Sequence, residues 1–130
     1  MSTVIIKLSP DNWQKYRDIR LIALKSDPLA FASSYEQEIQ FDEQIWRQNI
    51  HNMWFAMVNS QVVGMIGMLI IEESKNTNIG YVVSLWVSPQ FQKRQIGQAL
   101  VRAIQNFAAP KNLKKLILEV TASNQAAIGL

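Results

Sequence analysis

The chain has 130 residues, 48% of them hydrophobic and 18% charged, which predicts a single domain, residues 1–130, with a buried core. It has no cysteine and one histidine, His51, so disulfides, thiolate metal sites and multi-histidine sites are excluded and we expect no metal. The net charge of +3 comes from scattered Lys and Arg, and no long apolar run marks the N-terminus, so we expect no nucleic acid and no membrane as partner, and a cytoplasmic protein.

The N-terminal quarter predicts a short strand followed by a long helix. Val4–Leu8 is apolar, and Ser9 then offers a cap for a helix that begins with Pro10 and runs to about Lys25. On this helix we expect Arg20 to be mostly solvated. The expected buried side consists of Trp13, Tyr16, Ile19, Ile22, Ala23 and Leu24.

Two shorter segments follow the break at Asp27-Pro28. Leu29–Gln40 predicts irregular chain or a short helix, in which Glu36 and Glu38 form a solvated face. Asp42 is then the expected N-cap of a helix through about Ile50.

The middle of the chain predicts an antiparallel pair of strands. Met53–Val58 and Val62–Glu72 are apolar and separated by three residues suited to a tight turn. Gly64 and Gly67 within the second strand suggest a bulge or a close backbone approach. A polar turn, residues 73–78, leads into the next strand.

Residues 79–108 predict a strand, a turn and a helix. Ile79–Val87 reads as a strand that ends at Ser88-Pro89, and an apolar stripe from Ile96 then predicts a helix to Ala108. The helix N-terminus would present unpaired amides suited to an anion. Lys114–Thr121 predicts another strand, parallel to the first because a helix connects the two.

The turn before this helix resembles a pyrophosphate loop, and the resemblance extends over nearly the whole chain. Residues 92–97, QKRQIG, are similar to the Q/R-x-x-G-x-G/A loop of the GCN5-related N-acetyltransferases (GNAT). Gln92 and Gly97 match this pattern, whereas Gln95 stands where the family usually has its middle glycine. A glutamine fits there if the position is already helical, because only its amide is then needed.

Two further segments resemble the same family. Arg20–Leu24 and Pro28–Glu36 are similar to an R-L-x-A-L run followed by P-x-A-F-x-S-x-Y-E, which in the family lies over the acceptor side. Asn124, with Ala127 and Leu130, matches the motif N-x-x-A-x-x-L-Y as far as the sequence extends. The resemblance implies a following tyrosine, the rest of a last helix and two more strands, all beyond residue 130.

The resemblance implies an α/β (α+β) GNAT fold, with a mixed central sheet flanked by helices in the order β-α-α-β-β-β-α-β. It implies an N-acetyltransferase that uses acetyl-CoA and a primary amine, on a small molecule or a protein. The alternative is a non-catalytic acyl-CoA-binding or regulatory domain of the same fold. A homodimer would suit the family, and the acceptor and the oligomeric state stay open.

The same resemblance implies the residues that hold the cofactor, while the catalytic residues stay unknown. Leu85, Trp86 and Val87 would pair through their backbones with the pantetheine arm. The pyrophosphate would be held by Gln92, Lys93, Arg94, Gln95, Ile96, Gly97 and Gln98, with Asn124 as a further contact. The candidates for proton transfer, among which the sequence does not choose, are Glu119, Ser84, Tyr81, Glu72 and Glu36.

Overall fold

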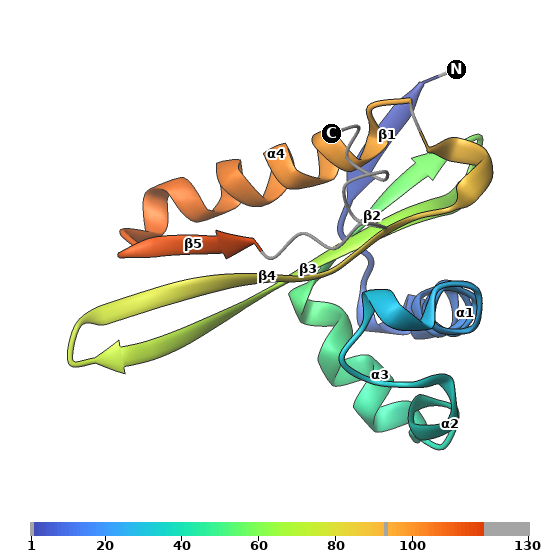
Figure 1. Ribbon diagram of the computed structural model, residues 1–130, viewed down its shortest axis with the longest axis horizontal. Helices are drawn as coiled ribbons and strands as arrows, with labels where there is room; N and C mark the ends of the chain where they lie inside the picture. The colour runs from blue at the N-terminus through green and yellow to red at the C-terminus, as the bar shows by residue number, and fades with distance from the viewer. Residues whose placement is uncertain (1, 93, 119–130) are drawn as a thin grey trace.

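A mixed five-stranded sheet forms the centre of the computed structural model, which describes residues 2–92 and 94–118 (Figure 1). The strands lie in chain order across the sheet, antiparallel from the first to the fourth, and the fourth and fifth are parallel. They are β1 (Thr3–Ile6), β2 (Met53–Val58), β3 (Gln61–Ser74), β4 (Thr77–Val87) and β5 (Lys115–Leu118). The parallel pair predicted from the strand–helix–strand order is thereby confirmed.

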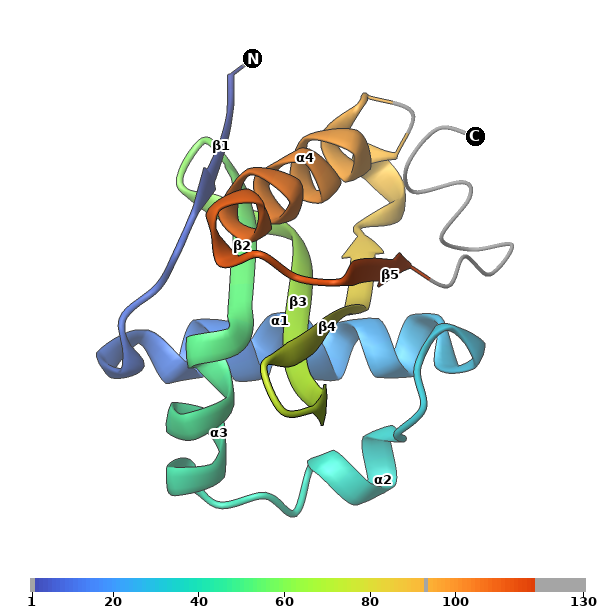
Figure 2. The ribbon, with the colours of Figure 1, turned by 90° about the vertical axis from the view of Figure 1, so that its left-hand side faces the viewer.

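Helices cover both faces of this sheet. One face is covered by α4, and the other lies against α1, α2 and α3 (Figures 1 and 2). Their bounds are α1 (Trp13–Ser26), α2 (Tyr35–Glu38), α3 (Glu43–Asn49) and α4 (Ile96–Ala108), with short 3₁₀ turns at Pro10–Asn12, Pro28–Ala30, Ile50–Asn52, Pro89–Phe91 and Ala109–Lys111. The predicted fold class is confirmed, and the single-turn α2 falls in the segment predicted to be irregular or a short helix.

The two faces of the sheet build two hydrophobic cores because successive strand residues point to opposite sides. On β2, Trp54 and Ala56 belong to the core under α4, where Leu100 and Ile104 are fully buried. Phe55, between them in sequence, belongs to the opposite core under α1 and α3. Each large apolar side chain buried in this way stabilises the fold by about 1.5–3 kcal/mol.

The predicted helix caps are partly realised. Asp42 caps α3, since its Oδ1 accepts a hydrogen bond from the Ile45 amide at 3.0 Å. Ser9, in contrast, makes no side-chain cap, because a 3₁₀ turn separates it from α1, which begins only at Trp13.

The predicted burial on α1 is wrong at two positions. Ile22 is 57% exposed, whereas Arg20 is only 9% exposed. The apolar periodicity located the correct helix, but it could not show that a cation on this helix has a buried partner from α2.

The hairpin of β3 and β4 is longer than the sequence indicated. The predicted polar turn at residues 73–78 is in fact a turn at Lys75-Asn76, because pairing continues to Ser74 and Thr77. Asn76 adopts a positive φ of 64°, which asparagine tolerates better than most residues. The hairpin extends past the helices at the lower left of Figure 1.

Both glycines of β3 lie where the backbone is crowded, as predicted. The β2–β3 register shifts between Ala56 and Met57, beside Gly64. At Gly67 a Cβ atom would lie 2.7 Å from the Met53 Sδ, which is too close for any side chain without movement.

Two leucine substitutions test the position of the core. Leu100 is 0% exposed, so Leu100→Ala should lower the free energy of unfolding by about 2–5 kcal/mol, since it removes buried surface and leaves a cavity. Leu29 is 89% exposed, and Leu29→Ala should change it by less than about 0.5 kcal/mol. Urea titrations measure both values, and equal losses would contradict this assignment of the core.

Candidate functional site

Among the described residues, β5 pairs with only the first part of β4. Their pairing runs from Ile79 opposite Lys115 to Val82 opposite Leu118, while β4 continues to Val87. Within residues 2–92 and 94–118, no strand pairs with this last part of β4 on its β5 side. Such an edge has backbone groups that an extended ligand can pair with.

Strand β4 contains a β-bulge opposite β3. Val83 pairs with Gly67 and Trp86 with Met65, so two residues of β4 stand opposite one of β3. The bulge residue Ser84 has a left-handed φ of 60°. Sequence reasoning expected crowding in β3 but gave no sign of this bulge in β4.

The bulge exchanges the two faces of the strand. Val82 and Leu85, three residues apart, both belong to the core under α4. Trp86 belongs to the core under α1 and α3. In a regular strand Val82 and Trp86 would share a face, so the bulge decides which side chains lie on which side of the sheet.

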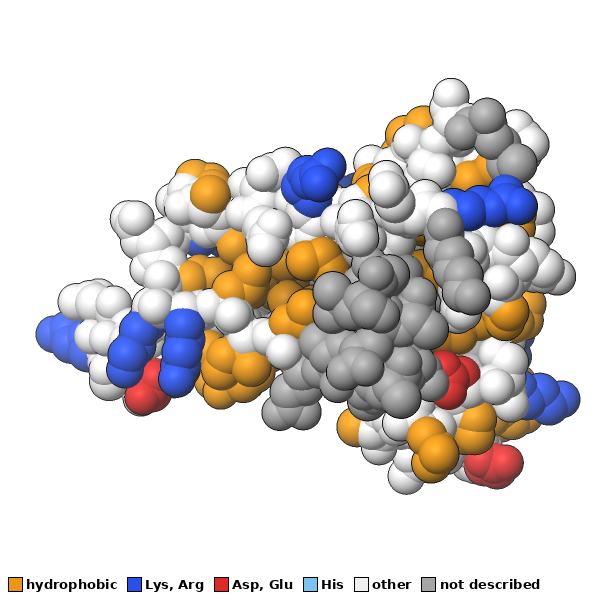
Figure 3. Space-filling view, turned by 45° about the horizontal axis from the view of Figure 1, so that its top comes forward, with side chains coloured by type: hydrophobic (Ala, Val, Ile, Leu, Met, Phe, Trp, Pro, Cys, Tyr) orange, Lys and Arg blue, Asp and Glu red, His pale blue; other side chains and the backbone are white. Residues whose placement is uncertain are grey.

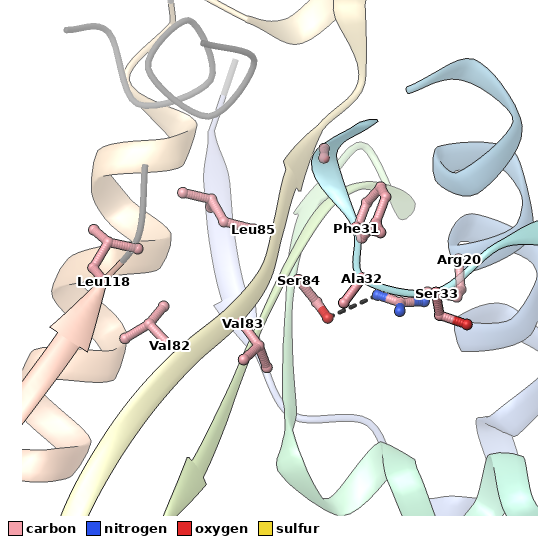
Figure 4. Close-up of a pocket in the computed structure, with 10 residues that line it drawn as sticks. Arg20, Phe31, Ala32, Ser33, Val82, Val83, Ser84, Leu85 and Leu118 are labelled. Carbon is pink, nitrogen blue, oxygen red and sulfur yellow. Dashed lines mark hydrogen bonds between the residues drawn. The ribbon is translucent and has the colours of Figure 1, made fainter. Parts of the chain in front are cut away.

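A cavity of about 260 Å³ opens beside the bulge (Figure 4). It lies between β4, the end of β5, helix α1 and the segment that joins α1 to α2. Its lining comprises Arg20, Ala30, Phe31, Ala32, Ser33, Val82, Val83, Ser84, Leu85 and Leu118.

Arg20 forms a buried ion pair at this cavity. Its Nε and Nη2 donate to the two carboxylate oxygens of Glu38, at 2.8 and 2.9 Å. Its Nη1 donates to the Ser84 Oγ at 2.7 Å, drawn as a dashed line in Figure 4. The Phe31 ring lies 4.7 Å from the guanidinium carbon. Glu38 is 4% exposed, so its predicted place on a solvated face is wrong. Both charges can be buried because each is neutralised by its partner in the ion pair.

The loop between β4 and α4 is fixed to the end of the strand. The Gln92 amide nitrogen Nε2 donates to the Val87 carbonyl at 3.1 Å. Gln95 is the N-cap of α4, and its carbonyl accepts the first helical hydrogen bond, from Ala99, at 3.0 Å. Gly97 is buried as the second residue of the helix.

The sequence departure at Gln95 has a structural consequence. Gln95 has φ 64° and ψ 15°, so the condition under which a glutamine would fit, a helical backbone at this position, is not met. The backbone here adopts the left-handed conformation that favours glycine, and a glutamine in it costs about 1–2 kcal/mol.

The predicted cofactor residues lie at two places. Leu85 lines the cavity, while Gln92, Arg94, Gln95, Ile96, Gly97 and Gln98 belong to the loop and the start of α4. The side chains of Trp86 and Val87 are buried in opposite cores, so only their backbones can meet a ligand. Lys93 and Asn124 lie outside the described residues.

Among the candidates for proton transfer, Ser84 lines the cavity. Tyr81 pairs with Leu69 and Ile117 farther along the strands, and Glu72 and Glu36 are exposed and not among the lining residues. Glu119 lies outside the described residues. Sequence reasoning missed Arg20 and Phe31 as lining residues, although the family-like motifs that contain them had marked this region.

Beyond the cavity, the described residues bear on three other features: a metal site, a membrane-spanning helix and a basic surface patch. They contain no group of three or more His, Cys, Asp or Glu placed to hold a metal. No helix in the described part of the chain has the length and apolar character needed to cross a membrane. On the face shown in Figure 3, basic side chains lie in several separate groups, and acidic side chains lie beside some of them.

Comparison with known proteins identifies the family. The model of the acetyltransferase (GNAT) family matches residues 13–130. The chain belongs to this family. No curated protein sequence matches it. Its family and its fold together support acetyl transfer as the activity.

Solved structures of GNAT proteins share the fold at low sequence identity. An aminoglycoside acetyltransferase from an uncultured soil metagenomic sample, in complex with sisomicin, has a TM-score of 0.72 at 18% identity, covering 98% of this chain and 83% of its own. A predicted acetyltransferase from Clostridium acetobutylicum, with acetyl-CoA, has a TM-score of 0.73 at 16% identity, with coverages of 93% and 82%. A ribosomal-protein-alanine N-acetyltransferase from Brucella melitensis biovar Abortus has a TM-score of 0.69 at 15% identity, with coverages of 95% and 84%.

The left-handed backbone at Gln95 predicts that glycine has opposite effects on stability at position 95 and at position 98 in the first turn of α4. Gln95→Gly should raise the free energy of unfolding by about 1 kcal/mol, because glycine adopts this conformation without a steric penalty. Gln98→Gly, at an exposed position inside α4, should lower it by about 1 kcal/mol. Denaturant titration distinguishes the two, and a destabilised Gln95→Gly variant would contradict the strain.

Proposed function

We propose that this GNAT domain transfers the acetyl group of acetyl-CoA to a primary amine. The observation that carries the proposal is the course of β4. This strand runs parallel to β5, bulges at Ser84 beside a cavity, and leads through a short turn to the N-terminus of α4. An extended ligand could lie along this strand, with its anionic group at the N-terminus of α4 and its reactive group at the cavity.

Two features of the described residues support binding of acetyl-CoA. The edge of β4 from Val83 to Val87 can pair with the pantetheine arm as an added strand would. The first amides of the 13-residue helix α4 have no partners within the helix and suit a pyrophosphate. Gly97 places no side chain over them at the second helical position, and Arg94 follows the turn at an exposed position. We add Lys93 and Asn124 to this proposed set on the family resemblance alone.

The cavity is the proposed place of reaction. When bound, acetyl-CoA supplies its acetyl group as a thioester, so that a C–N bond forms and the C–S bond breaks. A backbone amide of the bulged part of β4 would donate to the acetyl oxygen, where negative charge develops. The attacking amine must lose a proton and the sulfur must gain one. Ser84 is the candidate within reach of the cavity, and we assign no general base.

The acceptor is proposed to enter between β4 and the segment of residues 30–33. Two solved structures of the same fold are named for their acceptors, an aminoglycoside acetyltransferase and a ribosomal-protein-alanine N-acetyltransferase. Both acceptors carry a primary amine, and we propose one of these two kinds, a small-molecule amine or a protein amine, for this chain. Cytoplasmic location and a homodimer stay predictions.

Calorimetric titration tests the donor. Acetyl-CoA should bind saturably and ATP should not, because the site combines an anion-binding loop with an edge for an extended arm. Gly97→Val should weaken acetyl-CoA binding at least about tenfold, since a branched side chain would stand at the loop amides. Ala103→Val, later in the same helix, is the matched control and should bind as the wild type does. Unchanged affinity in a folded Gly97→Val variant would remove this loop from the site.

An acceptor screen tests the reaction. Release of free CoA thiol from acetyl-CoA should rise on addition of the correct amine, with aminoglycosides and peptides with an N-terminal alanine as first candidates. N-acetylated forms of the same compounds serve as controls, because they have no free amine. Saturable acetyl-CoA binding without thiol release for any amine would favour the non-catalytic alternative.

A further inference from the structure

Three elements meet at one side chain beside the cavity. Arg20 comes from α1, Glu38 from α2 and Ser84 from β4, and all three are joined by hydrogen bonds of 2.7–2.9 Å. Figure 4 shows the bond between Arg20 and Ser84. The proposed reaction uses the β4 backbone at this place but gives Arg20 no part. The pair is nevertheless the buried charged group of the described site.

We infer that Arg20 is a positioning residue for the acetyl site. Held by Glu38, it fixes Ser84 in the left-handed conformation of the bulge, and it thereby sets the direction of the β4 peptide groups beside the cavity. This inference rests on the proposed function, because it concerns how the bound acetyl group is received.

The bulge needs such a contact because serine does not favour its conformation. Ser84 has a φ of 60°, a region in which a Cβ atom crowds the backbone and which glycine adopts readily. Packing of Leu85 and Trp86 in opposite cores holds the strand after the bulge. The hydrogen bond from the Arg20 Nη1 to the Oγ holds the bulge residue itself.

Arg20 can hold Ser84 because it is immobilised. Two parallel hydrogen bonds to the Glu38 carboxylate fix the plane of the guanidinium, and Phe31 packs 4.7 Å from its centre. A lysine would offer neither the two parallel bonds nor the third donor in a fixed direction. The guanidinium is therefore a rigid link from the acceptor side of the cavity to β4.

The experiment compares the affinities of acetyl-CoA and CoA, because their ratio reports the acetyl group alone. For the wild type acetyl-CoA should bind more tightly. Ser84→Ala loses the hydroxyl but keeps the crowded Cβ, so the ratio should fall about threefold to tenfold, the effect of one hydrogen bond, at unchanged CoA affinity. Ser84→Gly also loses the hydroxyl but adopts the conformation freely, and it should recover part of this loss.

Replacement of the ion pair tests whether Arg20 acts through Ser84. Arg20→Met with Glu38→Leu removes both charges together and leaves neither one buried alone. The ratio should fall as in Ser84→Ala, and further addition of Ser84→Gly should raise it again. The control is Arg47→Met with Glu43→Leu, an exposed pair with the same 2.8 Å contact, which should leave the ratio unchanged.

A second measurement is the ¹³C shift of the carbonyl of acetyl-CoA labelled at that carbon. A hydrogen-bonded carbonyl in the wild-type complex should resonate downfield of the free compound, and Ser84→Ala should move it back. A merely structural role would lower both affinities alike and leave the shift of the remaining complex in place.

The outcomes separate this inference from the proposed function. A folded wild type that binds neither compound overturns the proposed function and the inference with it. If the wild type binds acetyl-CoA but equal affinity for CoA is found, or if the ratio and the shift do not respond to Ser84→Ala, only the inference is overturned. A double replacement whose loss Ser84→Gly does not reduce would also overturn it, because Arg20 would then act elsewhere.

Discussion

The exchange of faces within β4 is the constraint on which the site depends. Both faces of the sheet are buried, so each strand must present apolar side chains to two different cores. One extra residue at Ser84 lets Leu85 follow Val82 on the α4 side and turns Trp86 to the other side. Because a register slip of one residue would reverse this arrangement, the energy of both cores maintains the bulge. The bulge lies two residues after Val82, which pairs with Leu118 of β5, and the cavity lies there.

The buried ion pair at the cavity explains why the segment between α1 and α2 keeps its position. That segment is short of regular structure, and a cavity wall made from it needs a fixed contact with the sheet. Loss of one partner from a buried pair costs about 3–5 kcal/mol, whereas a fully apolar replacement can be neutral. The main effect of the pair is therefore to fix the positions of the elements it joins, and its contribution to the free energy of folding is secondary. It connects the proposed acceptor side of the cavity with the strand proposed to hold the donor.

The two ends of the proposed donor site use the backbone more than side chains. At the cavity it is the bulged strand, and at the other end it is the first turn of α4, which begins at a left-handed Gln95. Both positions hold a residue other than glycine in a conformation that favours glycine. Strain of this kind persists where the surrounding structure determines the backbone, and it is frequent at functional sites.

The sequence by itself determined the elements and their order. The apolar stripe of α4, the strands β2 to β4, the cap at Asp42 and the parallel β4–β5 pair all follow from short-range patterns, because periodicity and turn chemistry act between near neighbours. The motif around Gln92 and Gly97 likewise indicated the family from a few adjacent residues. Tertiary structure alone decided the burial of Arg20 and the bulge at Ser84. Arg20 contacts partners 18 and 64 residues away in the sequence. Packing in two cores determines the bulge, and these cores exist only when the sheet has formed. A local sequence pattern does not indicate contacts between residues so far apart, so the ion pair and the bulge at the site are seen only in the folded chain.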